Sequence, residues 1–149
     1  MRNLFNEPDV AVLLRRIDKL TPASKAEWGR MNISQMLAHC HISMETARGK
    51  HNMSWAFIGR IIGPIIKKQV LGDKPFRKNS PTDKSYIFPD NLDFEEQKAK
   101  AKASIVMFFE GGAAKCTRHP HPFFGKLSPE EWAIFQWKHL DHHLRQFGV

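Results

Sequence analysis

Cysteine is scarce in this sequence, which argues against a disulfide framework. The 149 residues contain two cysteines, Cys40 and Cys116, and they do not form a C-x-x-C pair. Small disulfide-stabilised domains carry many cysteines in short chains, so that class is excluded. A chain of this length, with an apolar fraction of 42%, can bury a hydrophobic core of its own. We therefore predict one domain spanning residues 1–149.

The sequence also lacks an uninterrupted apolar run long enough to cross a membrane, which needs roughly 20 apolar residues. Residues 54–71 are the most apolar stretch, and three cations interrupt it: Arg60, Lys67 and Lys68. We interpret this stretch as a buried or interface helix that Pro64 kinks or breaks, and as a surface for forming a homodimer. The first residues contain no apolar signal core, so we expect a cytoplasmic location.

Acidic residues are few relative to basic ones, with 15 Asp and Glu against 23 Lys and Arg and a net charge of +8. Such a balance suits nucleic acids or anionic membranes as partners. The cations are scattered, however, and do not cluster beside exposed aromatic residues as single-stranded nucleic-acid binding requires. Nucleic-acid binding is therefore the least favoured hypothesis. A solvated basic surface is the simpler interpretation, and it would also attract a small anionic substrate.

Apolar residues recur at helical spacing in four long segments, and no convincing alternating strand pattern occurs in the sequence. The segments are 10–20, 33–48, 93–110 and 129–148. Asn32, Asp93 and Ser128 stand at N-cap positions of the last three. We predict an all-α fold, a four-helix bundle with an extra helical insertion, residues 54–91, between the second and third bundle helices. The long loop 72–91 is expected to cover a site or an interface.

Three of the eight histidines lie within five positions of the last predicted helix. On a helical wheel, His139 and His143 lie one above the other at the edge facing the bundle. His142 lies nearer the charged arc, where Asp141 is expected to be solvated. A histidine pair at this spacing can bind one divalent cation, but two ligands alone make a weak site. The candidates for a third ligand are His39, Cys40, His41 and His121.

The residues alone leave several alternatives open. Histidines at the edge of a helix often bond only to water or to a backbone carbonyl. The second predicted helix does not decide between His39 and His41, because neither is clearly nearer to its apolar stripe, and Cys40 is interpreted as a core residue. A ligand histidine is normally oriented through its other ring nitrogen. The candidate partners for that role are Gln35, Glu45, Gln136 and Asp141.

Three motifs in chain order carry a family resemblance: WGRMNISQMLAHC (28–40), HPFFGKLSPEEW (121–132) and KHLDHHLRQFG (138–148). Together they resemble the DinB/YfiT-like superfamily, and most closely its branch of uncharacterised bacterial proteins. Members are four-helix bundles in which one histidine of the second helix and an H-x-x-x-H pair of the last helix hold a metal. The resemblance implies that His39, His139 and His143 bind a divalent ion such as Zn, Ni or Fe. It implies for His121 a place in the pocket or a role in bracing the loop before the last helix.

The resemblance also implies an activity. Characterised members of that superfamily include metal-dependent transferases that use a low-molecular-weight thiol, and a thiol-dependent isomerase. We therefore expect a metal-dependent enzyme, a transferase or a hydrolase, whose metal activates a thiol or water nucleophile toward a small-molecule substrate. No residue identifies the electrophile. The alternative is a non-catalytic bundle, dimeric and related to stress, that binds a metal or a small ligand.

Overall fold

The structure is a computed structural model that describes residues 1–51, 66–80, 82, 84–121 and 123–149. Four long helices dominate these residues: α1 (Glu7–Asp18), α2 (Ile33–Ala47), α4 (Phe94–Gly111) and α5 (Pro129–Gln146). Two short 3-10 helices follow α2 and α4, namely η1 (Lys84–Tyr86) and η2 (Ala113–Lys115). The described residues contain no strand, and one isolated bridge joins His121 to Gly125. The predicted all-α class is confirmed.

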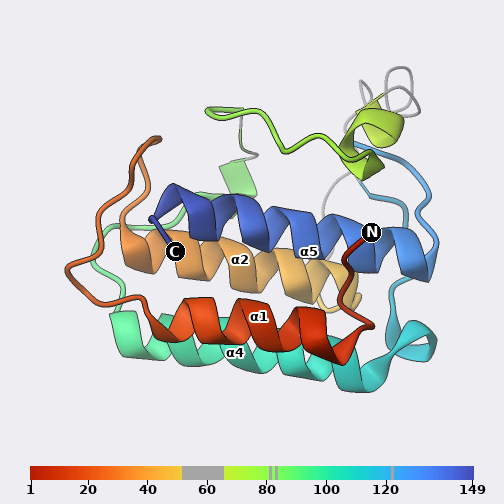
Figure 1. The fold of residues 1–149 in the computed structure, drawn as a ribbon, viewed down its shortest axis with the longest axis horizontal. Coiled ribbons are helices and arrows are strands. Elements are labelled where there is room, and N and C mark those ends of the chain that lie inside the picture. Colours follow the sequence, from red (N-terminus) through yellow and green to blue (C-terminus); the bar gives the residue numbers. More distant parts are fainter. Residues whose placement is uncertain (52–65, 81, 83, 122) are drawn as a thin grey trace.

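The long helices form two layers, with α1 beside α4 in one and α2 beside α5 in the other (Figure 1). Helix α2 packs against α4 and α5, and α1 also packs against both. Helices α1 and α5 run in one direction, whereas α2 and α4 run in the other (Figure 1). Because α2 and α4 are parallel, the chain between them must return along the length of the bundle. The segment predicted as an insertion belongs to this crossover, which passes over the outer side of the α2–α5 layer (Figure 1).

The prediction of an apolar helix over residues 54–71 is tested only in part. Residues 52–65 lie outside the described residues, and residues 66–71 are helical. The 3-10 helix η1 within the predicted loop was not expected from the sequence. No helix among the described ranges combines the length and apolarity that crossing a membrane demands.

Side-chain caps fix where the helices begin. The Ser128 hydroxyl accepts from the Glu131 backbone amide at 3.2 Å, and the Glu131 carboxylate accepts from the Ser128 amide at 2.7 Å. Asn32 and Gln35 form the same reciprocal box at the start of α2. These caps are the ones that the sequence predicted. Helix α1 begins earlier than predicted, at Glu7, because Pro8 is compatible with the first helical turn.

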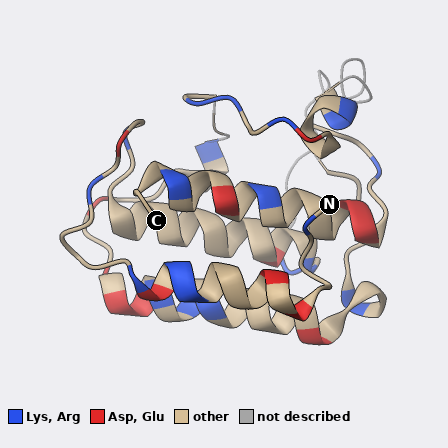
Figure 2. Ribbon diagram, in the orientation of Figure 1, with Lys and Arg blue, Asp and Glu red and all other residues tan. Residues whose placement is uncertain are grey.

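The core lies between the two layers and is built from the apolar faces of all four long helices. Its fully buried side chains include Leu13, Leu37, Met44, Ile105 and Leu140. Lys and Arg are spread over α1, α4, α5 and the connecting segments (Figure 2). Helix α2 contains neither residue, consistent with its burial on several sides. The basic residues of the described ranges are therefore distributed over several elements.

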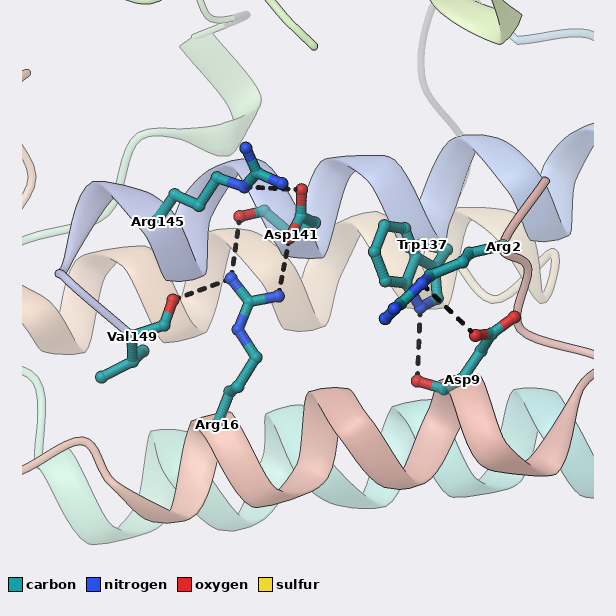
Figure 3. Close-up of polar contacts among 7 residues, drawn as sticks. All are labelled: Arg2, Asp9, Arg16, Trp137, Asp141, Arg145 and Val149. Carbon is teal, nitrogen blue, oxygen red and sulfur yellow. Dashed lines mark hydrogen bonds and ion pairs between the residues drawn. The ribbon is translucent and has the colours of Figure 1, made fainter. Parts of the chain in front are cut away.

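Polar contacts join α1 to α5 on one side of the bundle (Figure 3). Arg16 Nη1 lies 2.6 Å from Asp141 Oδ1, and its other terminal nitrogen donates to the main-chain oxygen of Val149 at 2.7 Å. Arg145 Nε lies 2.9 Å from Asp141 Oδ2. The expectation that Asp141 is solvated is wrong, since its side chain is 14% exposed. Asp141 lies on the part of the charged arc that faces α1, and its ion pair with Arg16 replaces water.

Candidate metal centre

Three histidine side chains from two helices meet between α2 and α5. His39 Nε2 lies 2.9 Å from His139 Nε2, and His143 Nε2 lies 3.2 Å from the same His139 atom. One nitrogen from each ring lies within 4.8 Å of the other two. His39 and His143 are buried, and His139 is partly buried. The sequence prediction that His139 and His143 face the bundle agrees with this placement, and the structure brings His39 to the pair.

The local structure explains why these three rings meet. The capping boxes at Asn32 and Ser128 fix where α2 and α5 begin, and the apolar face that each helix buries determines which of its residues face the bundle. The i, i+4 spacing then places His139 and His143 on one side of α5. A neighbouring pair, Ser43 and Gln136, bonds across the same interface at 3.1 Å. The two helices are thus locked in register beside the histidines.

The hydrogen bonds of His143 settle which of its nitrogens carries the proton. Gln146 Nε2 donates to the Trp28 carbonyl at 2.7 Å, so the amide oxygen of Gln146 must face His143. His143 Nδ1 lies 2.8 Å from that oxygen and therefore donates to it. The neutral ring then has a free lone pair on Nε2, the nitrogen that faces the other two histidines. Gln146 holds His143 in the form that a metal requires.

His39 is oriented in the same way, by a backbone group. Its Nδ1 lies 3.4 Å from the carbonyl oxygen of Tyr86, which can only accept, so its lone pair is also on Nε2. His139 Nε2 lies between these two acceptors. If His139 carries its proton on Nε2, it can donate to one of these acceptors, but its buried Nδ1 then has an unpaired lone pair. That Nδ1 has no hydrogen-bond partner among the described residues. In either tautomer, the three rings leave hydrogen-bonding capacity unused.

The environment keeps the rings neutral. Burial lowers the pKa of His39 to about 4, against a smaller opposing effect of the Tyr86 carbonyl. Burial, with the nearby His39, lowers the pKa of His143 to about 3. The pKa of His139 is also lowered well below its usual value, again by burial first. Neutral imidazole is the form that coordinates a metal, so no proton has to be displaced near neutral pH.

The donor set, three imidazole nitrogens, suits a divalent first-row transition metal or zinc. Nitrogen ligands lie about 2.0–2.1 Å from zinc, so two nitrogens in a tetrahedral site are about 3.3 Å apart. The two short separations here, 2.9 and 3.2 Å, are slightly smaller. Small movements of the rings would therefore lengthen these two separations to the tetrahedral value. Three imidazoles do not by themselves select among Zn, Ni and Fe.

The histidines lie at the inner end of a pocket of about 1130 Å³. Its walls come from α2, α5, the α1–α2 connection, the crossover and the turn at residues 121–125. Lys138 of α5 holds the crossover in place, because its ammonium donates to the main-chain oxygens of Val70, Gly72 and Lys74. A volume of this order accommodates a small organic ligand. The loop predicted to cover a site contributes several of the lining residues.

His121 lines this pocket but is not one of the three clustered histidines. Its Nδ1 accepts from the backbone amides of Phe123 and Phe124 at 3.1 and 3.3 Å, so its neutral ring carries the proton on Nε2. Burial lowers the pKa of His121 to about 3. Its ring stacks on Phe124, with centroids 4.1 Å apart. His121 therefore both braces its turn and forms part of the pocket wall, the two roles considered from the resemblance.

The remaining sequence candidates lie elsewhere. Cys40 is buried in the core with its sulfur 3.6 Å from that of Met36, and burial raises the pKa of its thiol, as expected of a core residue. His41 is partly buried on α2 and outside the histidine cluster. Among the proposed orienting residues, Gln35 caps α2 and Glu45 pairs with Arg48. Neither of them bonds to a clustered histidine.

The two groups that orient the rings were missed in the sequence. Gln146 is three residues after His143, a spacing that brings helix side chains together, so the helical wheel could have found it. The Tyr86 carbonyl could not have been found, because every residue has a backbone oxygen and the residue type does not indicate its role. It depends on η1, which the sequence pattern did not indicate.

The fold and site together define an all-α bundle with a three-histidine cluster at the inner end of a large pocket. The chain belongs to the family described as "Protein of unknown function (DUF1569)", whose family model matches residues 4–148. The sequence motifs predicted an uncharacterised family, and this part of the prediction is confirmed. No curated protein and no solved structure gives a match to this chain.

Proposed function

We propose that this protein is a metal-dependent enzyme in which His39, His139 and His143 hold one divalent ion. The observation that carries the proposal is the meeting of three Nε2 atoms, two of them held as lone-pair donors by Gln146 and the Tyr86 carbonyl. Three protein ligands leave coordination positions for water or substrate, the pattern of catalytic sites. A structural site would use four ligands and have no pocket. The relationship to the DinB/YfiT-like superfamily is part of this proposal.

The chemistry follows from the site. When bound, the ion would lower the pKa of a thiol or a water molecule and so supply a nucleophile at neutral pH. The protein's own part is to hold the three imidazoles neutral, to orient two of them, and to surround the substrate with aromatic side chains that exclude water. The resemblance favours a low-molecular-weight thiol as the nucleophile and a transferase as the class, with a hydrolase as the form that uses water.

Metal content tests the first half of the proposal. Untagged protein, incubated with Zn²⁺ and dialysed, should retain about one ion per chain by elemental analysis, as a three-ligand catalytic site does. The His139→Ala variant should retain almost none. The matched control is His41→Ala, which removes a partly buried histidine outside the cluster and should leave the content unchanged. An empty wild type would refute the proposal.

Turnover tests the second half. Metal-loaded wild type and His139→Ala would be screened with small thiols against simple electrophiles, and for ester and amide hydrolysis. The wild type should exceed the variant with at least one pair. Stoichiometric metal without any turnover across the screen would instead favour the non-catalytic metal- or ligand-binding bundle. Light scattering would test the predicted homodimer and its dependence on protein concentration.

A further inference from the structure

The pocket around the histidines has an uneven charge. The chain contains 15 acidic residues, yet none is among the described residues that line the pocket. Two cations do line it, Arg30 and Arg77. Both arginines are exposed, so they lie on the open side of the pocket. The described lining therefore offers two positive charges and no negative charge to a molecule that enters.

The two arginines belong to connections far apart in the sequence that meet at the mouth. Arg30 lies between α1 and α2, whereas Arg77 lies on the crossover. Lys78 Nζ is 4.0 Å from the ring centroid of Trp28, which ties the crossover to the α1–α2 connection. The neighbouring Lys78 adds a third cation beside the mouth. The positive charge thus comes from two segments that converge, unlike the scattered charge elsewhere (Figure 2).

The inner wall of the pocket is aromatic. The rings of Phe76 and Phe124 both pack against Phe135, at centroid distances of 5.9 and 5.2 Å. Phe135 in turn stacks on His139, with centroids 5.8 Å apart and planes 18° apart. An apolar surface therefore reaches from the mouth to the histidine cluster. A ligand that fills this space must bring an apolar body as well as a head group that tolerates the cations.

We propose that the pocket selects small organic anions, with a carboxylate or sulfonate head group at Arg30 and Arg77 and an apolar body against Phe76, Phe124 and Phe135. Arginine binds such oxyanions through paired charge-assisted hydrogen bonds. Organic cations are disfavoured because no acidic side chain of the described lining pairs with them. This inference names the substrate class of the proposed enzyme and so rests on the proposed function, although the charges that select the ligand are independent of the ion.

A probe series with a constant body and a variable head group tests the selection. Octanoate, octan-1-ol and octylammonium would be titrated below their aggregation limits into protein freed of metal with EDTA, which prevents the carboxylate from binding an ion. Octanoate should bind about tenfold or more tightly than octylammonium, the size of effect expected from one charge-assisted contact. The preference should weaken as salt is raised.

Two double variants separate the pocket cations from the net charge. Arg30→Gln with Arg77→Gln should abolish the preference for octanoate. Arg15→Gln with Arg118→Gln removes the same charge from exposed positions outside the pocket lining and should preserve it. Equal binding of the three probes, no binding of any of them, or equal losses in the two double variants would overturn the inference.

The outcome is distinguishable from that of the proposed function. If the protein binds no metal but prefers octanoate through the two arginines, the anion pocket stands and the metalloenzyme proposal fails. If the protein binds zinc and turns over a substrate but shows no preference among the probes, the metalloenzyme proposal stands and the anion pocket fails.

Discussion

Two polar clusters lie on different sides of α5, one facing α1 and the other facing α2. In the first, the Asp141 carboxylate is paired with Arg16 and Arg145, and each charge has an opposite partner (Figure 3). In the second, three like groups face one another, and among the described residues the partners that orient them are Gln146 and the Tyr86 carbonyl. The first cluster is complete within the protein. The second leaves hydrogen-bonding capacity unused, and a cation at its centre would complete it.

The comparison shows how one helix can carry both kinds of cluster. Residues 139, 141 and 143 alternate between them, because successive odd positions on a helix are about 200° apart. Polar residues buried by folding are either satisfied in place or retained for a ligand. Burial alone does not distinguish the two cases, since Asp141 and His139 are both largely buried. The hydrogen-bond and ion-pair partners of each residue distinguish the two cases. They also predict that the two clusters respond differently to substitution and to pH.

Acid should produce the largest effect, and it acts on the histidines. The folded pKa values of His39, His121 and His143 are about 4, 3 and 3, below the unfolded value of 6.5. Between these values the unfolded chain binds protons that the folded chain does not, so stability is complete above pH 6.5 and falls as pH decreases. Each histidine should cost about 2 kcal/mol of unfolding free energy by pH 5.

Urea unfolding of metal-free protein at pH 7.5 and pH 5 would measure this loss. The His143→Gln variant should show a smaller loss, because it removes one of the groups that titrate in the unfolded chain. His119→Gln, which replaces an exposed histidine, should behave as the wild type. A midpoint that does not change between the two pH values would contradict the buried, neutral state of the rings.

Removing the carboxylate of the first cluster should damage the fold and spare the site. Asp141→Ala leaves the largely buried Arg16 without its carboxylate partner, at a cost of about 3 kcal/mol of unfolding free energy. Zinc affinity should change by less than about twofold, since Asp141 contacts none of the three histidines. The control Asp18→Ala breaks an exposed pair with Lys102 and should cost under about 1 kcal/mol. A large fall in zinc affinity for Asp141→Ala would show that the clusters are coupled.

Removing Gln146, the partner of His143, should weaken zinc binding more than it lowers stability. Gln146→Leu deletes the acceptor that fixes its tautomer, and we expect zinc to bind about 10–100-fold more weakly. The control Gln136→Leu makes the same change at a buried glutamine that bonds to Ser43 and to no histidine. It should lower stability more than metal affinity. Competition with a chromophoric chelator would measure the zinc affinity of both variants. Equal affinities would show that Gln146 has no role in metal binding.

The sequence predicted the bundle well because the caps and apolar periodicity that define it are local. Asn32, Asp93 and Ser128 cap their helices as expected, and His139 with His143 faces inward at the i, i+4 spacing. The choice of His39 over His41 depended on the resemblance, because the helix of both residues is apolar over much of its circumference. The exposure of the Asp141 side chain was predicted wrongly, because a helical wheel shows which arc is charged but not which neighbouring helix covers that arc. The Tyr86 carbonyl depends on tertiary structure alone.

The smallest effect should come from a glycine that lies next to the second cluster. Gly29 has a φ of +83°, and a Cβ there would lie 2.5 Å from Gln146 Nε2, the atom that fixes the orientation of that amide. Gly29→Ala should therefore displace Gln146 and weaken zinc binding about threefold to tenfold, less than its deletion does. It should also cost about 1 kcal/mol of stability through backbone strain. Gly112→Ala is the matched control, because Gly112 has a φ of +56° and nothing within 4 Å of the added atom. The two variants should lose similar stability, and only Gly29→Ala should lose zinc affinity; equal affinities would show that the approach of Gln146 to the backbone does not tune the metal centre.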